Sequence, residues 1–306
     1  MSLFGAMYWY LIEPLNSNGV ISVFEHHYPG KVLLLGAGGG LVVTILSLVV
    51  GRLYAKHLSI LALPAGLTAW AAMTGRMDQL LLECTTVAER AGLFHRMILD
   101  SLFWTGLVLA VFFLVQVVIK LGKSDSDIYQ NNEIVLPNAP NKELSKPKQK
   151  KDFLPSGSRL KDIMSIGLAC LIAFLLLKVL AQSGRAEYRL NNFQTVQIST
   201  IPAIKQILFA VLVAFAAGAF AAHQLFSTKL AVFFLSPALV SIVAYGLASQ
   251  SWAMEPLAQS NSPILLSSVG FAGILPIQYV GIGSLGAIAG YWLSIYTNQV
   301  RLAHGK

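Results

Sequence analysis

Charge is scarce in this sequence. Charged residues make up 12% of the 306 positions and hydrophobic residues make up 55%, and the mean hydropathy is +0.64. Ordinary soluble domains carry about 25% charged residues. The charges that are present lie in clusters, with long uncharged stretches between them. This composition excludes an ordinary soluble domain and predicts an integral membrane protein that crosses the bilayer several times.

Sequence signatures of catalysis and cofactor binding are also lacking. The glycine-rich run 36–40 is not followed by the Lys-Ser/Thr pair of a phosphate-binding loop. No serine nucleophile elbow, dinucleotide fingerprint or H-E-x-x-H metal motif occurs. We therefore predict a protein without enzymatic activity, and with no cofactor and no metal.

Cysteine is rare, and basic residues are missing from the start of the chain. Of the two cysteines, Cys84 falls in a predicted outer loop and Cys170 in an apolar stretch, so no disulfide is predicted. A cleavable signal peptide has a basic start, but no Lys or Arg precedes Lys31. The apolar run 3–12 is too short to span a bilayer, and its aromatic residues Tyr8, Trp9 and Tyr10 suit the headgroup level, so we expect residues 1–31 to form an outer tail with an interfacial helix.

Seven apolar stretches have the length that one helical crossing of a bilayer requires, about 20 residues. They predict an all-α membrane protein of seven transmembrane helices at positions 32–51, 58–75, 101–119, 163–181, 206–222, 230–248 and 277–296. Ionisable residues inside these stretches are almost absent: Lys178 lies near one end, where it can reach the headgroups. Asp100, Lys205 and His223 flank predicted spans and are given no role.

Two shorter apolar segments are predicted on the outer side. Residues 77–98 show apolar positions at helical spacing with charges between them, which predicts an amphipathic helix that continues into the third span. Residues 264–275 are apolar but too short to cross a bilayer. The sequence leaves open whether this second segment is interfacial or re-entrant.

The segment 120–162 is the most polar part of the chain, and it sets the predicted orientation. It holds nine of the 22 Lys and Arg residues and is too poor in apolar residues to form a core. With this segment, one set of alternating loops carries fourteen basic residues and the other set seven. Because basic loops stay in the cytoplasm, we predict an outer N-terminus and a cytoplasmic C-terminus in a plasma or inner membrane.

The same flexible loop is predicted to bind anionic lipid headgroups or an acidic partner, because basic residues beside a bilayer are attracted to anionic lipid. This explanation makes a nucleic-acid partner unnecessary. The candidate contact residues are Lys146, Lys148, Lys150, Lys151, Arg159 and Lys161.

Small residues recur four positions apart in three predicted spans. Such spacing places them on one face of a helix, where two backbones can approach closely in lipid. The predicted packing residues are Gly36 and Gly40, then Ala214, Gly218 and Ala222, and finally Gly286 and Gly290.

A possible internal repeat divides the chain. Lys56 precedes Pro64 by eight residues, and Lys229 precedes Pro237 by the same eight. Both prolines are predicted to kink their helices. The predicted organisation is 3+1+3: an outer tail 1–31, a three-span group 32–119, the basic loop 120–162, a linking span 163–181, an outer loop 182–205, a second three-span group 206–296 and a cytoplasmic tail 297–306.

Three functions remain compatible with these features. The first is a structural subunit of a membrane assembly, with a membrane-protein partner or a second copy of the chain. The second is a permease for small solutes, built from two three-span copies, in which the short segment 264–275 lines a site. The third is an outer-face enzyme that would use His26, His27, His95 and Glu83.

Overall fold

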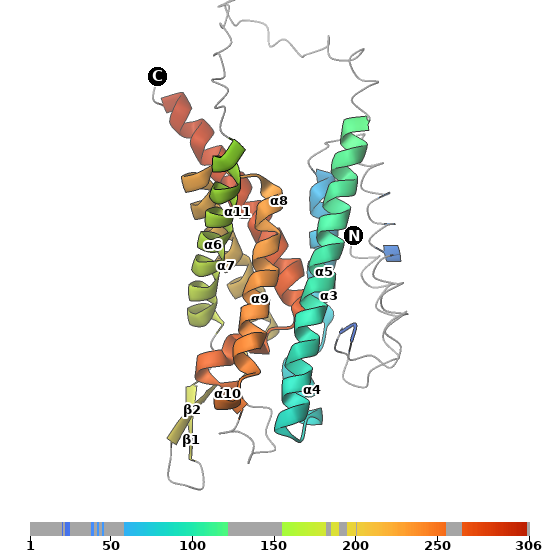
Figure 1. The fold of residues 1–306 in the computed structure, drawn as a ribbon, viewed down its shortest axis with the longest axis vertical. Helices are drawn as coiled ribbons and strands as arrows, with labels where there is room; N and C mark the ends of the chain where they lie inside the picture. Colours follow the sequence, from blue (N-terminus) through green and yellow to red (C-terminus); the bar gives the residue numbers. More distant parts are fainter. Residues whose placement is uncertain are drawn as a thin grey trace, which may run out of the picture.

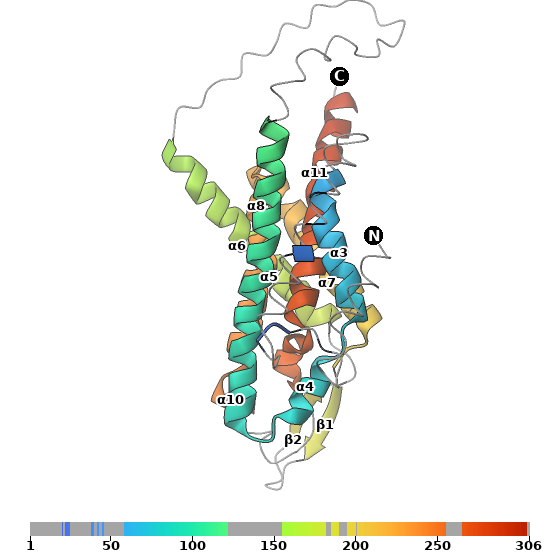
Figure 2. The ribbon, with the colours of Figure 1, turned by 90° about the vertical axis from the view of Figure 1, so that its right-hand side faces the viewer.

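The computed structural model describes residues 20, 22–24, 38–39, 42, 45, 58–121, 155–181, 185–189, 195–199, 201–254 and 265–304, and the structural statements below concern these residues. Helices dominate this part of the chain, and the long ones run side by side along the long axis of the molecule (Figures 1 and 2). The all-α class predicted from the sequence is therefore confirmed. The long helices are α5 (Val87–Leu121), α6 (Pro155–Leu180), α7 (Ile204–Phe226), α9 (Leu235–Ala248) and α11 (Pro276–His304).

Short elements connect the long helices. They are the 3-10 helices η2 (Leu58–Leu61) and η4 (Ser267–Gly273), the helices α3 (Ala62–Met73), α4 (Met77–Glu83), α8 (Leu230–Phe233) and α10 (Ser251–Met254), and the strands β1 (Arg185–Arg189), β2 (Thr195–Ser199) and β3 (Leu265–Leu266).

Four of the described helical stretches are long and apolar enough to cross a membrane, which is consistent with a membrane protein. They lie in α5, α6, α7 and the combined α8–α9. A fifth is reached if η4 and α11, which meet at 83°, form one broken span. The predicted span 58–75 contains only the 12-residue α3 preceded by η2, and the predicted span 32–51 lies almost entirely outside the described residues. The count of seven thus stays a prediction.

The start of α5 is determined by a local hydrogen-bonding pattern. The Thr86 hydroxyl accepts a hydrogen bond from the backbone N–H of Glu89, at 3.2 Å, and the Glu89 carboxylate accepts one from the backbone N–H of Thr86, at 3.1 Å. This reciprocal pattern is a capping box, which satisfies N–H groups that have no partner inside the helix. The predicted amphipathic helix 77–98 is consequently divided: α4 holds its first part, and its second part is continuous with the third span.

A small antiparallel sheet forms at the end of the molecule that carries α4 and α10 (Figure 1). Strand β2 lies between β1 and β3, and Ile198 stands opposite Leu266. The sequence predicts a loop over 182–205 and an interfacial or re-entrant helix over 264–275. The structure instead forms a hairpin of β1 and β2 in the first region, and β3 followed by η4 in the second. The two-residue β3 depends on pairing with a distant strand, which no local pattern predicts.

Helices α6, α7 and α11 pack with their backbones in direct contact. A Cβ atom added to Gly218 of α7 would lie 2.6 Å from the carbonyl oxygen of Ala169 in α6. A Cβ on Gly286 of α11 would lie 2.5 Å from the carbonyl oxygen of Leu212 in α7, and one on Gly290 would overlap the carbonyl of Ala216. Dispersion contacts at this range hold helices together in lipid, where burial of apolar surface supplies no driving force.

The structure describes four of the six remaining predicted packing and kink residues. Ala214 and Ala222 of α7 are fully buried, whereas Gly36 and Gly40 lie outside the described residues. Pro64 is the third residue of α3, after η2, and Pro237 is the third residue of α9, after the α8–α9 junction at Phe234. Proline is well tolerated in a first helical turn, because the N–H that it lacks would have no helical partner there.

Replacing Gly290 with alanine should destabilise the protein, because the new methyl group cannot fit beside Ala216 without moving α7 from α11. Gly106 of α5 is the matched control, since a Cβ there would meet nothing within 4 Å. Gly106→Ala should be neutral or stabilising by up to about 1 kcal/mol, the helix-propensity difference. Thermal unfolding of the purified protein in detergent measures both effects. Equal unfolding midpoints for the two variants would show that the α7–α11 contact is dispensable.

Candidate functional site

The first candidate region is centred on Asp100 of α5, which is completely buried. One carboxylate oxygen accepts a hydrogen bond from the Ser22 hydroxyl at 2.5 Å, and the other accepts backbone N–H bonds from Val23 at 3.1 Å and Phe24 at 3.2 Å. A carboxylate is stable away from water only when such donors surround it. The arrangement therefore anchors residues 22–24 to α5.

The second region is the break between η4 and α11, where buried side chains bind the irregular backbone. Tyr245 of α9 donates its hydroxyl to the carbonyl of Ile274 at 2.5 Å, and Tyr279 of α11 donates to the carbonyl of Phe271 at 2.8 Å. The side chain of Gln278 accepts from the backbone N–H of Leu275 at 3.0 Å. Irregular backbone at membrane depth is tolerated where protein encloses it, and all of these residues are buried.

The break is also fastened to its neighbours. The amide of Gln278 donates to the carbonyl of Ala71 in α3 at 3.3 Å. The ring of Tyr245 stacks on Phe94 of α5 with 6.2 Å between centroids, and it meets Tyr279 edge-on at 6.1 Å. Helices α3, α5, α9 and α11 thus all contribute to one buried unit around the 83° bend.

Polar pairs also join helices at the opposite end of the bundle. The Nδ1 atom of His223 in α7 lies 2.7 Å from the hydroxyl of Ser294 in α11, and both residues are buried. The hydroxyl of Ser165 in α6 lies 2.8 Å from that of Thr228 in the connection between α7 and α8, and both residues are buried. Because Ser294 has no exposed surface, the His223–Ser294 pair connects two helices and presents no nucleophile to a substrate.

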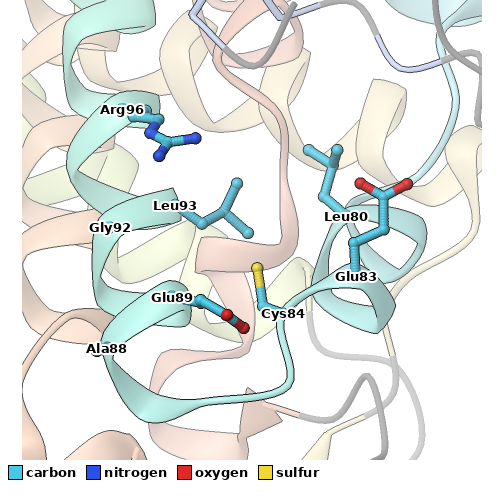
Figure 3. A pocket seen from close by; sticks show the side chains of 8 residues that line it. All are labelled: Leu80, Glu83, Cys84, Ala88, Glu89, Gly92, Leu93 and Arg96. Carbon is cyan, nitrogen blue, oxygen red and sulfur yellow. The ribbon is translucent and has the colours of Figure 1, made fainter.

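The third region is an open pocket of about 440 Å³ between α4 and α5 (Figure 3). Glu83 stands on the α4 wall, Glu89 and Arg96 stand on the α5 wall, and Cys84 lies between the two helices. Buried leucines form part of the lining, and Ala88 and Gly92 leave room because their side chains are small. This volume is within the range of about 300–1,000 Å³ that is typical of small-molecule sites.

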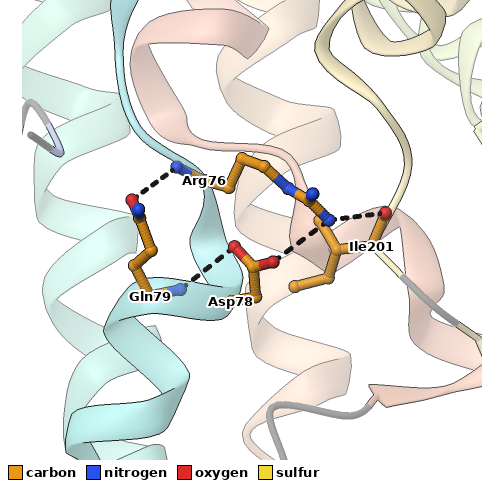
Figure 4. A network of polar contacts seen from close by, with 4 residues as sticks. All are labelled: Arg76, Asp78, Gln79 and Ile201. Atoms are coloured by element: carbon orange, nitrogen blue, oxygen red, sulfur yellow. Dashed lines mark hydrogen bonds and ion pairs between the residues drawn. The ribbon is translucent and has the colours of Figure 1, made fainter. Parts of the chain in front are cut away.

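A surface network lies near α4, at the turn between α3 and α4 (Figure 4). The guanidinium of Arg76 forms an ion pair with Asp78 at 3.0 Å and donates a hydrogen bond to the carbonyl of Ile201 at 3.1 Å. The Arg76 and Asp78 side chains are 42% and 25% exposed, so solvent screens their attraction. The bond to Ile201 connects the α3–α4 turn to the residues that lead from β2 into α7.

The residues proposed for an outer-face enzyme are not all brought together. Glu83 lines the pocket, whereas His95 is exposed on α5, lies outside the pocket lining and has its Nδ1 atom 2.7 Å from the carbonyl oxygen of Ala91. His26 and His27 lie outside the described residues. Among the residues that the structure describes, no group of three or more His, Cys, Asp or Glu side chains is placed to hold a metal ion.

The predicted basic loop falls mostly outside the described residues, including Lys146, Lys148, Lys150 and Lys151. Helix α6 begins at Pro155, eight residues before the predicted start of its span, and it includes Arg159 and the exposed Lys161. Asp100 is the residue that sequence reasoning missed most clearly. Its position before an apolar run suggested a span boundary, and its partners are more than 70 positions away in the chain.

No family model matches the chain, and no curated protein or solved structure matches it either.

Asp100→Asn should release the segment 22–24 and destabilise the protein by about 2–3 kcal/mol, because hydrogen bonds to a charged acceptor are worth about 1.5–3 kcal/mol and an amide turns one acceptor into a donor. Asp162→Asn on α6 is the matched control. Thermal unfolding in detergent measures stability. Reaction of a Phe24→Cys reporter with a thiol reagent, with both native cysteines changed to alanine, measures release. Unchanged reactivity and stability in Asp100→Asn would contradict the anchoring role.

Proposed function

We propose that this chain is a non-catalytic structural subunit of a membrane assembly, with seven transmembrane helices, an outer N-terminus and a cytoplasmic C-terminus. The observation that carries the proposal is the direct backbone contact among α6, α7 and α11 at Gly218, Gly286 and Gly290. Helices in such contact cannot slide without overlap, so they favour a rigid body over one that changes shape. A rigid body with polar elements at both ends suits a scaffold that holds partners in place.

The placement of the helix ends supports the proposed orientation. The C-terminal end of α5, the N-terminal end of α6 and the C-terminal end of α11 lie at one end of the molecule, and α4, α10 and the β1–β2 hairpin lie at the other (Figure 1). The end of α5 and the start of α6, which both fall within the predicted basic loop 120–162, therefore share a side with the end of α11. The predicted cytoplasmic side follows from the excess of basic residues there.

The proposed 3+1+3 repeat is supported by two corresponding junctions. Pro64 and Pro237 each stand third in a helix that follows a short helical turn. Helices α3 and α9 both run toward the end that carries α4 and α10 (Figures 1 and 2). Parallel copies require this common direction, and inverted copies would reverse it.

Partners of the proposed subunit follow from its surface. The six basic candidates Lys146, Lys148, Lys150, Lys151, Arg159 and Lys161 would hold the loop against anionic headgroups, each contributing about 1 kcal/mol near such a surface. A membrane-protein partner or a second copy would pack against the helices. One wide apolar surface is on α6, where Ile163, Leu171 and Val179 are largely exposed.

The permease alternative retains one specific observation in its favour. The 83° bend between η4 and α11 is a broken helix, and transporters often bind solutes where helices are broken. Against this alternative, the hydroxyls of Tyr245 and Tyr279 and the side chain of Gln278 already bind the backbone groups at the break. A solute would have to compete with those contacts.

Purification in a mild detergent separates the two functions. A structural subunit should elute with a reproducible set of partner proteins, or as a defined oligomer of this chain, in fixed proportions. The second measurement uses the isolated protein in vesicles, which should show no solute uptake above protein-free vesicles. A monomer without partners that carries solute across the vesicle membrane would refute the subunit and establish the permease.

Thiol labelling of intact cells tests the orientation. With Cys170 changed to alanine, Cys84 should react with an impermeant reagent added outside, because α4 is proposed to face outward. A cysteine at Ser156, near the start of α6, should react only after the cells are opened. Cys84 and Ser156→Cys are each tested as the single cysteine of a separate variant, and the two variants are compared at equal expression. Labelling of Ser156→Cys in intact cells would reverse the proposed orientation.

A further inference from the structure

The pocket between α4 and α5 lies where the polar end of α5 meets its apolar part. Arg96 lines the pocket, and Leu99 and Leu102, three and six residues further along the helix, are 48% and 49% exposed. On the α4 side, Leu82 next to Glu83 is 56% exposed. Exposed leucines beside a charged pocket are the pattern of a surface at the boundary between headgroups and acyl chains.

The charges in the pocket have both signs and are arranged in order along α5. Arg96 is nearer to the apolar part of the helix, and Glu89 is seven residues further out. At about 1.5 Å per residue, these two positions are roughly 10 Å apart along the axis. Glu83 adds a second carboxylate from the α4 wall, and Figure 3 shows the Arg96 side chain extending from the opposite wall.

We propose that this pocket binds the headgroup of a phospholipid that carries a primary ammonium outside its phosphate. In such a lipid the phosphate is next to the acyl chains and the ammonium is further out, which matches the order of Arg96 and the two glutamates. Arg96 would bind the phosphate, and Glu83 and Glu89 would accept hydrogen bonds from the ammonium. The acyl chains would lie along Leu99 and Leu102. This inference does not depend on the proposed subunit role.

The side chains have the capacity for a ligand in addition to their present bonds. A guanidinium has five N–H donors, and a carboxylate has about four acceptor positions. Within the capping box, the Oε2 atom of Glu89 accepts the bonds from Thr85 and Thr86, which leaves the Oε1 atom for an ammonium. A quaternary ammonium has no N–H to donate, so a choline headgroup would satisfy the carboxylates less well.

The purified full-length protein with Cys170→Ala provides the test, because Cys84 then reports on occupancy of the pocket that it lines. Its alkylation by a maleimide is measured in detergent with short-chain phosphatidylethanolamine, phosphatidylcholine or free phosphoethanolamine. At a concentration about ten times its dissociation constant, the ethanolamine lipid should slow alkylation about tenfold, because the rate falls by a factor of one plus the ratio of the lipid concentration to that constant. The choline lipid and free phosphoethanolamine should slow it less than about twofold at the same concentration.

Matched variants identify the contacts. Glu83→Gln should reduce the preference for ethanolamine over choline, because Glu89 remains, and Arg96→Gln should weaken protection by both lipids. Asp162→Asn and Arg301→Gln on other helices should leave protection unchanged. The rate of Cys84 alkylation without lipid, together with the unfolding midpoint, shows whether each variant keeps the parent fold; if Glu83→Gln does not, Glu83→Asp replaces it and should keep part of the preference.

Three results would overturn the proposal. The first is equal protection by the ethanolamine and choline lipids in the parent protein, and the second is no protection by either. The third is protection by free phosphoethanolamine as strong as that by the lipid, which would identify a site for a soluble zwitterion. None of these results bears on whether the chain elutes with partner proteins.

Discussion

The close approach of α7 and α11 at Gly290 and Ala216 is the contact on which the rest of the bundle depends. In hydrocarbon, burying apolar side chains between two helices gives no hydrophobic stabilisation, because lipid is equally apolar. The helices therefore associate through short-range dispersion and polar contacts. Glycine permits short-range dispersion and polar contacts between helices, because without a side chain it lets the two backbones approach closely. Helix α7 uses the same device on its other side, where Gly218 meets Ala169 of α6. Helix α7 is therefore the centre of a three-helix unit, and large apolar side chains such as Phe209 and Leu225 remain on its exposed surface.

A second constraint is that backbone polar groups cannot remain unbonded inside a membrane. The chain departs from regular helix between η4 and α11, and the groups released there find partners on α9 and α11 themselves. The same constraint applies to Asp100. Its buried carboxylate accepts hydrogen bonds from residues 22–24. Both arrangements hold segments that are distant in the chain against the long helices.

These two constraints bear differently on function. The glycine contacts limit the motion of α6, α7 and α11 relative to one another, which favours a body that positions other molecules. The pocket between α4 and α5 lies outside that rigid unit, and its two walls meet at the short connection from Cys84 to Thr86, where Arg90 of α5 donates a hydrogen bond to the carbonyl of Cys84. A headgroup there would bridge the walls by binding Glu83 on one and Arg96 on the other. Lipid could thereby complete a part of the fold that the protein leaves open.

The sequence by itself determined the helical class and the apolar character of the chain, because these depend on composition and on runs of about 20 residues that any reader can count. It also marked the small residues of α7 and α11, since a four-residue spacing is visible locally. The tertiary structure alone decided which backbone each glycine meets, that Asp100 is an anchor, and that residues 265–266 form a strand. Those outcomes require partners far away in the chain, such as Ser22 for Asp100 and Ile198 for Leu266. The spacing of apolar residues along the chain does not indicate which distant residues will pair. These pairs are therefore seen only in the folded structure.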